Sequence, residues 1–138
     1  CATIGSYIAM LSGLSFLGVG LTPADLYFHE HVFFVIVGFR SMVPAMVFLT
    51  LAFFFSPVSN KYTVASVLFL LSITLYAFFE TSDPPDVSPR ENLELFKESI
   101  SYNRMVISVI AQKVITLISF VSFFVFTYGF YQLSLLKK

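Results

Sequence analysis

Four stretches of apolar residues dominate the chain, and short polar segments separate them. The apolar stretches cover residues 2–21, 32–55, 62–79 and 110–135. An α-helix needs about 20 such residues to cross a hydrocarbon core of about 30 Å. Their apolar runs are unbroken rather than alternating, which excludes a membrane-strand barrel and leaves helices as the spanning structure. The pattern predicts an all-α fold, a polytopic membrane helix bundle with four transmembrane helices in a single domain over residues 1–138.

The long polar segment at 80–104 contains a second, shorter pattern. Ser88 and Glu91 stand three residues apart, which is the spacing of a capping box at a helix start. Apolar residues then recur on one helical face, at Leu93, Phe96 and Ile100. We therefore expect a short amphipathic helix over about residues 89–100, with its apolar face toward the membrane or the bundle.

The second span shows signals for both its start and its shape. Thr22 and Pro23 are typical of an N-cap and a first helical residue, and Asp25 would then stand in the first turn. The second helix is therefore expected to begin before residue 32. Pro44 lies in the middle of this span and removes one backbone hydrogen bond, so we expect a kink there.

Composition and charge support the membrane interpretation and exclude one class of partner. Of the 138 residues, 57% are hydrophobic and only 12% are charged, more apolar surface than a soluble domain of this size can bury. Eight basic residues balance eight acidic ones, so the chain lacks the basic excess that nucleic-acid binding needs. The chain starts at Cys1, its single cysteine, and we expect it to be N-terminally incomplete.

The distribution of lysines favours one orientation. With four spans, the N-terminus, the 56–61 turn and the C-terminus share a side, which carries Lys61, Lys137 and Lys138 and no acidic residue. The positive-inside rule then predicts a multi-pass protein of the cell membrane with both visible termini cytoplasmic.

Candidate chemistry gathers between the first two spans. If the second helix begins at Pro23, Asp25 and His29 are four residues apart on one face. Such a pair could ligate a metal, or the carboxylate could orient the imidazole as a proton acceptor. Zinc needs three or four ligands, so a metal site would also require His31. The simpler alternative is that Asp25 caps the helix and His29 hydrogen-bonds to it.

Two cations lie inside the spans. Arg40 falls on the same predicted face as Asp25 and His29, so these three residues form a candidate polar stripe. An arginine in lipid is costly and should face the bundle with a partner. Lys113 lies in the outer part of the fourth span, and together with Arg40 it could bind an anionic group such as a lipid headgroup. The alternative is that Lys113 extends outward to the interface and Arg40 pairs with Glu80, Asp25 or a carboxylate on a further helix.

Two short motifs resemble a known family. The run Gly18-Val-Gly-Leu-Thr-Pro-Ala-Asp25, followed by His29 or His31, resembles the glycine-proline-acid-histidine junction of a bacterial and archaeal six-span membrane protein family of unknown function, related to DRAM-like and FRAG-like proteins. The run Ala111-Gln-Lys-Val114 resembles its late-helix pattern. The resemblance implies an integral membrane protein of which this chain represents the last four spans, and it implies no reaction.

These patterns favour a non-enzymatic membrane protein that binds lipid or a small molecule, or that assembles with membrane helices or a second copy of itself. Gly5, Ala9 and Gly13 stand four residues apart, a spacing that favours close helix packing in lipid. Arg40 and Lys113 add the anion-binding potential. No cofactor is expected for this function.

Two other functions stay open at this stage. Asp25, His29 and His31 would serve a metal-dependent membrane hydrolase, with zinc as the metal. Arg40 and Pro44 in one helix would serve a small transporter. The sequence contains no nucleophile elbow, P-loop, dinucleotide fingerprint or HExxH motif, so an enzyme is the less favoured class.

Overall fold

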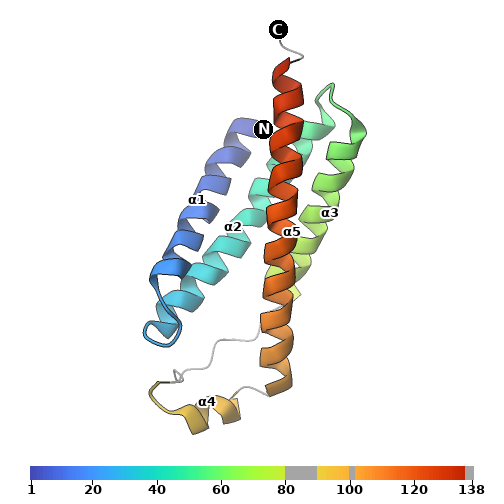
Figure 1. Ribbon diagram of the computed structural model, residues 1–138. Coiled ribbons are helices and arrows are strands. Elements are labelled where there is room, and N and C mark those ends of the chain that lie inside the picture. The colour runs from blue at the N-terminus through green and yellow to red at the C-terminus, as the bar shows by residue number, and fades with distance from the viewer. Residues whose placement is uncertain (80–89, 100–101, 136–138) are drawn as a thin grey trace.

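The computed structural model describes residues 1–79, 90–99 and 102–135, and these form five α-helices without a strand. The helices are α1 (Ala2–Leu21), α2 (Phe28–Phe54), α3 (Asn60–Phe79), α4 (Leu93–Ser99) and α5 (Tyr102–Leu135) (Figure 1). The predicted all-α fold is confirmed. By length and composition, α1, α2, α3 and the 109–135 part of α5 are able to cross a membrane.

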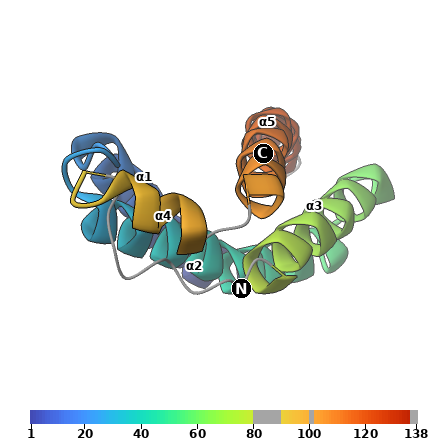
Figure 2. The same cartoon turned by 90° about the horizontal axis from the view of Figure 1, so that it is seen from below.

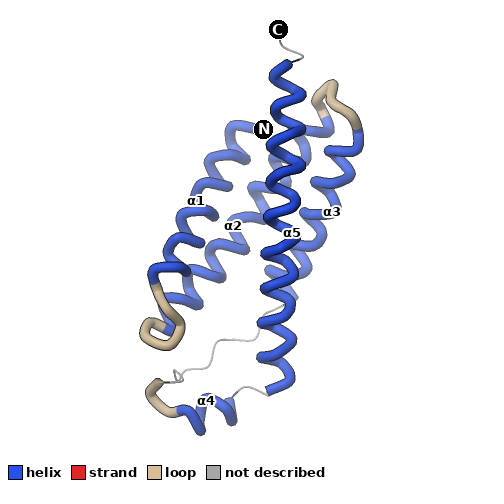
Figure 3. The backbone as a smooth tube through the Cα atoms, viewed as in Figure 1, coloured by secondary structure: helices blue, strands red, loops and turns tan. Residues whose placement is uncertain are grey.

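The four long helices form a curved layer and a separate column. α1 packs along α2, and α2 packs along α3, while α5 packs mainly along α3. Viewed along the bundle, α1, α2 and α3 make the layer and α5 stands against its concave side (Figure 2). The first residues of α1, the turn at 55–59 and the last residues of α5 share one end of the bundle, as predicted (Figure 3). The turn at 22–27 and α4 lie at the other end.

The core lies where α2, α3 and α5 meet. Phe53, Phe69, Ile73 and Phe126 are all at most 4% exposed. The ring centroid of Phe126 lies 5.8 Å from that of Phe53 and 5.9 Å from that of Phe69. Such dense contact between side chains is what holds α5 to the layer.

The α1–α2 seam is held by small residues. A Cβ at Gly5 would lie 3.1 Å from the backbone oxygen of Ala45, so only glycine allows the two backbones to approach so closely. Further along, Ser12 Oγ donates a hydrogen bond of 2.7 Å to Gly38 O across the seam. The predicted stripe is correct at Gly5 but wrong at Gly13, where a Cβ would meet nothing within 4 Å. The helices cross, so the contact line moves around α1 and leaves the four-residue spacing.

α2 begins at Phe28 and not at Pro23, so the predicted N-cap at Thr22 is wrong. Thr22 is instead the C-cap of α1, because its Oγ1 and its backbone N–H both donate to Gly18 O, at 2.8 and 3.0 Å. The backbone N–H of Tyr27 then donates to Pro23 O at 2.8 Å, which closes a tight turn before α2. A threonine hydroxyl can cap the helix before it as well as the helix after it, and here the first use prevails.

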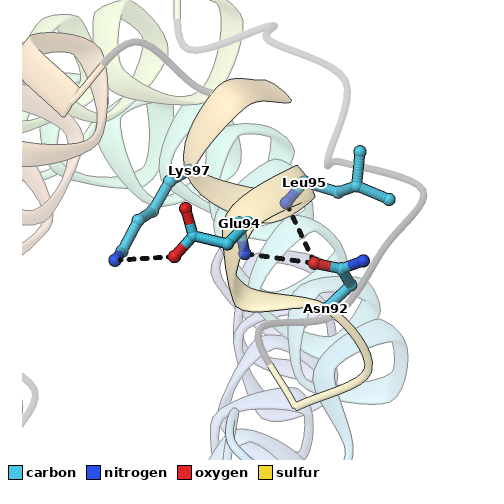
Figure 4. A network of polar contacts seen from close by, with 4 residues as sticks. All are labelled: Asn92, Glu94, Leu95 and Lys97. Carbon is cyan, nitrogen blue, oxygen red and sulfur yellow. Dashed lines mark hydrogen bonds and ion pairs between the residues drawn. The ribbon is translucent and has the colours of Figure 1, made fainter.

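α1 and α3 begin and end within two residues of their predicted spans, whereas α5 begins at Tyr102, eight residues before the predicted span at 110–135. α2 runs across Pro44 to Phe54, and the expected kink stays a prediction. α4 is shorter than predicted, and Ser88 lies outside the described residues. In the structure Asn92 caps this helix, since its Oδ1 accepts hydrogen bonds of 3.2 Å from the backbone N–H groups of Glu94 and Leu95 (Figure 4).

α4 is attached to the start of α2 by an aromatic contact. The ring of Phe96 meets that of Phe28 edge to face, with centroids 5.7 Å apart. On its exposed side, Lys97 Nζ lies 3.5 Å from Glu94 Oε1 (Figure 4). Of the three residues of the predicted apolar face, Phe96 therefore contacts the bundle, Leu93 is exposed, and Ile100 lies outside the described residues.

Candidate functional site

The acid–histidine cluster does not form the pair that its spacing predicts. Asp25 lies exposed in the turn before α2, whereas His29 lies in the first turn of α2 and is exposed. The expected pair on one face of a helix is therefore wrong, because Asp25 is not part of the helix. The His29 ring instead lies edge to face with the neighbouring Phe28 ring, with centroids 5.7 Å apart.

His31 is the histidine that the fold engages. Its Nδ1 lies 2.6 Å from the backbone oxygen of Thr22, nine residues earlier. A carbonyl oxygen can only accept, so Nδ1 carries the proton in this hydrogen bond. His31 thereby ties the first turn of α2 to the end of α1. A sequence pattern based on helical faces does not reveal this contact.

The candidate metal ligands remain separate. Within the described ranges, no three or more His, Cys, Asp or Glu side chains are placed so that they could hold one metal ion. Asp25, His29 and His31 therefore do not form a common set of ligands.

The cations inside the spans point away from the helix contacts. Arg40 is exposed, and it has no hydrogen-bond or ion-pair partner in the part of the chain that the structure describes. Arg40 therefore does not face the described helices as expected, and Glu80, one of its expected partners, lies outside the described residues. His29 and Arg40 do share a face of α2, about 20° apart at 100° per residue, without Asp25. Lys113 is exposed on α5, which agrees with the alternative that it extends outward.

A concave feature that sequence patterns did not predict is a groove between α5 and the α1–α2 pair. Gly129 brings α5 against α2 and α3 at one end, since a Cβ there would lie 2.9 Å from Tyr62 and 3.0 Å from Phe53. Further along α5 the helices separate and enclose about 330 Å³. We call this space the α1–α2–α5 groove. Its wall consists of Ala9, Ser12, Gly13, Phe16, Phe39, Met42, Ala45, Met46, Leu49, Thr116, Ser119, Phe120 and Phe123.

The hydroxyl groups in the groove wall are already occupied. Ser12 Oγ donates to Gly38 O, Ser119 Oγ to Ile115 O at 2.8 Å and Thr116 Oγ1 to Gln112 O at 2.7 Å. Each hydroxyl has one proton to donate, and each of these donates to a backbone carbonyl. The wall therefore offers hydrocarbon and aromatic surface without a free donor, which suits an apolar guest.

One signal in the sequence could have located this groove. Ser12 and Gly13 on α1 lie about one helical turn before Phe16, and Thr116 and Ser119 on α5 lie within one turn of Phe120. Small side chains on two helices leave room that the large ones only partly fill. The pairing of α1 with α5 is a property of the tertiary fold, however, and no periodicity in either span encodes it.

A comparison with protein-family models, with curated proteins and with solved structures found no match. The evidence on class therefore comes from the chain itself. Four helices of membrane-crossing length and composition are compatible with an integral membrane protein. The resemblance to a six-span family stays a prediction.

Proposed function

We propose that this chain is an integral, multi-pass protein of the cell membrane that binds the hydrocarbon part of a lipid in the α1–α2–α5 groove. The observation that carries the proposal is the groove itself, with about 330 Å³ of space and an almost entirely apolar wall. Small-molecule sites in proteins are typically concave, mostly apolar and of about this size or larger.

A lipid chain is the occupant that the surroundings supply. A groove left empty would forfeit dispersion contacts along its whole wall. Water is a poor alternative, because a bound water needs two or more polar partners and the hydroxyls of the wall already donate to the backbone. In a bilayer the adjacent solvent is acyl chain, and it offers the dispersion contacts that the wall requires.

Labelling with a lipid whose acyl chain carries a photoactivatable group tests this function. The protein is reconstituted in phosphatidylcholine vesicles containing the probe, irradiated, and digested for mass spectrometry. We expect adducts on groove residues such as Met42 and Phe120 to exceed those on outward residues such as Leu17 several-fold. Equal labelling of both sets would contradict the proposal.

The chain offers a matched control for that experiment. Gly13 and Gly20 are both exposed on α1, and a Cβ at either would meet nothing within 4 Å, but only Gly13 lines the groove. Gly13→Trp should fill the groove and lower its labelling several-fold, whereas Gly20→Trp should leave it unchanged. Crosslinks between two copies through Gly13→Cys in place of lipid adducts would indicate a helix-assembly surface.

The proposed orientation has its own test. Cys1 is exposed and is the single cysteine of the chain, at the end of the bundle that carries Lys61. With both termini cytoplasmic, a membrane-impermeant maleimide should label Cys1 only after the cells are permeabilised. Labelling of intact cells would reverse the orientation.

A further inference from the structure

A second concave surface lies on the outer side of the α3–α5 contact, at the end of the bundle where α3 begins. It encloses about 440 Å³ and is lined by Lys61, Tyr62, Phe124, Val125 and Tyr128. Tyr62 is buried, whereas Lys61 and Tyr128 are exposed. We call this surface the α3–α5 depression. It is separate from the α1–α2–α5 groove, with which it shares no lining residue.

Lys61 is held in place but has no acidic partner there. Its Nζ lies 5.1 Å from the centroid of the Tyr62 ring, within the range of a cation–π contact. In the part of the chain that the structure describes, no carboxylate lies within ion-pair distance of Lys61. The ammonium group is therefore oriented by an aromatic ring while its charge stays uncompensated.

The position of Lys61 in the first turn of α3 makes the binding of an anion beside it still more favourable. α3 begins at Asn60, so Lys61 lies in the first turn, where the helix macrodipole is positive and a cation is unfavourable. The neighbouring segments at this end, residues 1–12, 55–64 and 125–135, contain no Asp or Glu. An anion brought from outside would interact favourably with both the ammonium group and the helix end.

The aromatic side chains give the depression a polar and an apolar level. Tyr128 and Phe124 lie one turn apart on α5, about 6 Å along the axis, with Tyr128 nearer the end of the bundle. The Tyr128 ring lies 6.5 Å from that of Tyr62, and Phe124 is 77% exposed. Tyrosine is suited to the headgroup level of a bilayer and phenylalanine to the acyl level below it. A phospholipid has the same order of groups.

We propose that Lys61, Tyr128 and Phe124 form a binding site for one anionic phospholipid of the surrounding membrane. Its phosphate lies at the Lys61 ammonium group, and one acyl chain lies along Phe124. This inference rests on the proposed membrane location and is independent of what fills the groove. One lysine at a membrane surface is worth about 1 kcal/mol toward an anionic lipid, which corresponds to about a fivefold preference.

The sequence contains no tryptophan, so a single introduced one reports on this site alone. Tyr128→Trp keeps an interfacial aromatic ring in the depression. The full chain is placed in lipid nanodiscs, and fluorescence quenching by phosphatidylglycerol with brominated acyl chains is compared with quenching by brominated phosphatidylcholine. We expect about a fivefold preference for the anionic lipid at position 128.

Tyr7→Trp is the matched probe. Tyr7 lines a depression of the same volume, about 440 Å³, at the same end of the bundle, and no charged residue lines that depression. Its quenching should show no preference between the two lipids. Equal preferences at positions 128 and 7 would mean a general attraction of anionic lipid to this end, and would overturn the site.

Variants of the lysine separate charge from structure. In the Tyr128→Trp background, Lys61→Gln should lower the preference from about fivefold to about one, and Lys61→Arg should restore it. Lys97→Gln, the same charge change on α4 at the opposite end, should leave it unchanged. A preference retained in Lys61→Gln would overturn the proposal, as would failure of Lys61→Arg to restore it.

Inorganic phosphate in excess distinguishes the source of the anion. Because the proposed occupant is anchored by its acyl chain, soluble phosphate should not lower the preference at position 128. Loss of the preference in phosphate would indicate a site for a soluble anion and contradict the lipid site. Photolabelling of the groove stands apart from all of these measurements, so either proposal can fail while the other holds.

Discussion

The α1–α2 seam and the α1–α2–α5 groove lie side by side on the same two helices and are built in opposite ways. In the seam, Gly5 brings the backbones together and Ser12 bonds across to Gly38. In the groove, large side chains such as Met42 and Phe120 line open space, and the α5 hydroxyls Thr116 and Ser119 bond within their own helix. The comparison teaches that a small residue closes a helix contact where a second backbone lies against it, as at Gly5, and leaves room for a guest where none does, as at Gly13.

Replacement of a phenylalanine by alanine should give the largest difference in stability between the packed core and the open groove. Phe126 is 4% exposed in the core and Phe120 is 61% exposed beside the groove. Phe126→Ala should lower the free energy of unfolding by about 3 kcal/mol, at the lower end of the range for buried aromatic residues. The loss is at the lower end because a ring exposed on unfolding meets lipid in place of water. Phe120→Ala should cost less than about 0.5 kcal/mol. Unfolding in mixed detergent micelles measures both, and equal losses would remove the distinction between core and groove.

Addition of a side chain tests the same contrast in the other direction. Gly5→Leu places a Cβ about 3 Å from Ala45 O and the Leu49 side chain and should cost about 1–3 kcal/mol through overpacking. Gly13→Leu projects into open space and should change the free energy of unfolding by less than about 0.5 kcal/mol. Both variants insert the same side chain into α1, so the same unfolding measurement isolates the contact. A tolerated Gly5→Leu would show that the seam is looser than described.

The histidine at the end of the seam should have a smaller effect. His31→Leu removes the hydrogen bond to Thr22 O and should cost about 1 kcal/mol. His29→Leu removes an exposed imidazole without a hydrogen bond in the described residues and should be nearly neutral. Protection of the Tyr27 and His31 amides in hydrogen exchange should fall in the His31 variant alone. Equal stability and equal amide protection in the two variants would mean that the hydrogen bond from His31 to Thr22 O does not stabilise the contact between α1 and α2.

The smallest expected effect concerns the interhelical hydrogen bond. Hydrogen bonds between membrane helices contribute about 0.6 kcal/mol on average, so Ser12→Ala should cost about that amount. Ser72→Ala is the control, because Ser72 Oγ donates to Leu68 O within its own helix. It should be neutral in the same unfolding measurement. If Ser72→Ala cost as much as Ser12→Ala, the bond across the seam would have no special role.

Hydrophobicity predicted the helices well because each span must satisfy its own backbone, a local property. Local sequence signals were weaker where one side chain can cap either of two neighbouring helices. Thr22 could cap the helix after it or the helix before it, and its bond to Gly18 O decided the start of α2 and removed Asp25 from the helix. The exposed position of Arg40 and the groove depend on which helices become neighbours. No pattern within one span carries that information.

The helices meet in nearly the order in which the chain is made. α1 meets α2 and α2 meets α3, each across a short turn, while α5 joins only after α3 and residues 80–101, which include α4, have been synthesised. Contacts between consecutive helices close small loops and form early. During biosynthesis the α1–α2 hairpin can therefore complete its seam before α5 leaves the ribosome. α5 alone completes the groove, so in the proposed membrane location the walls from α1 and α2 meet lipid before α5 does.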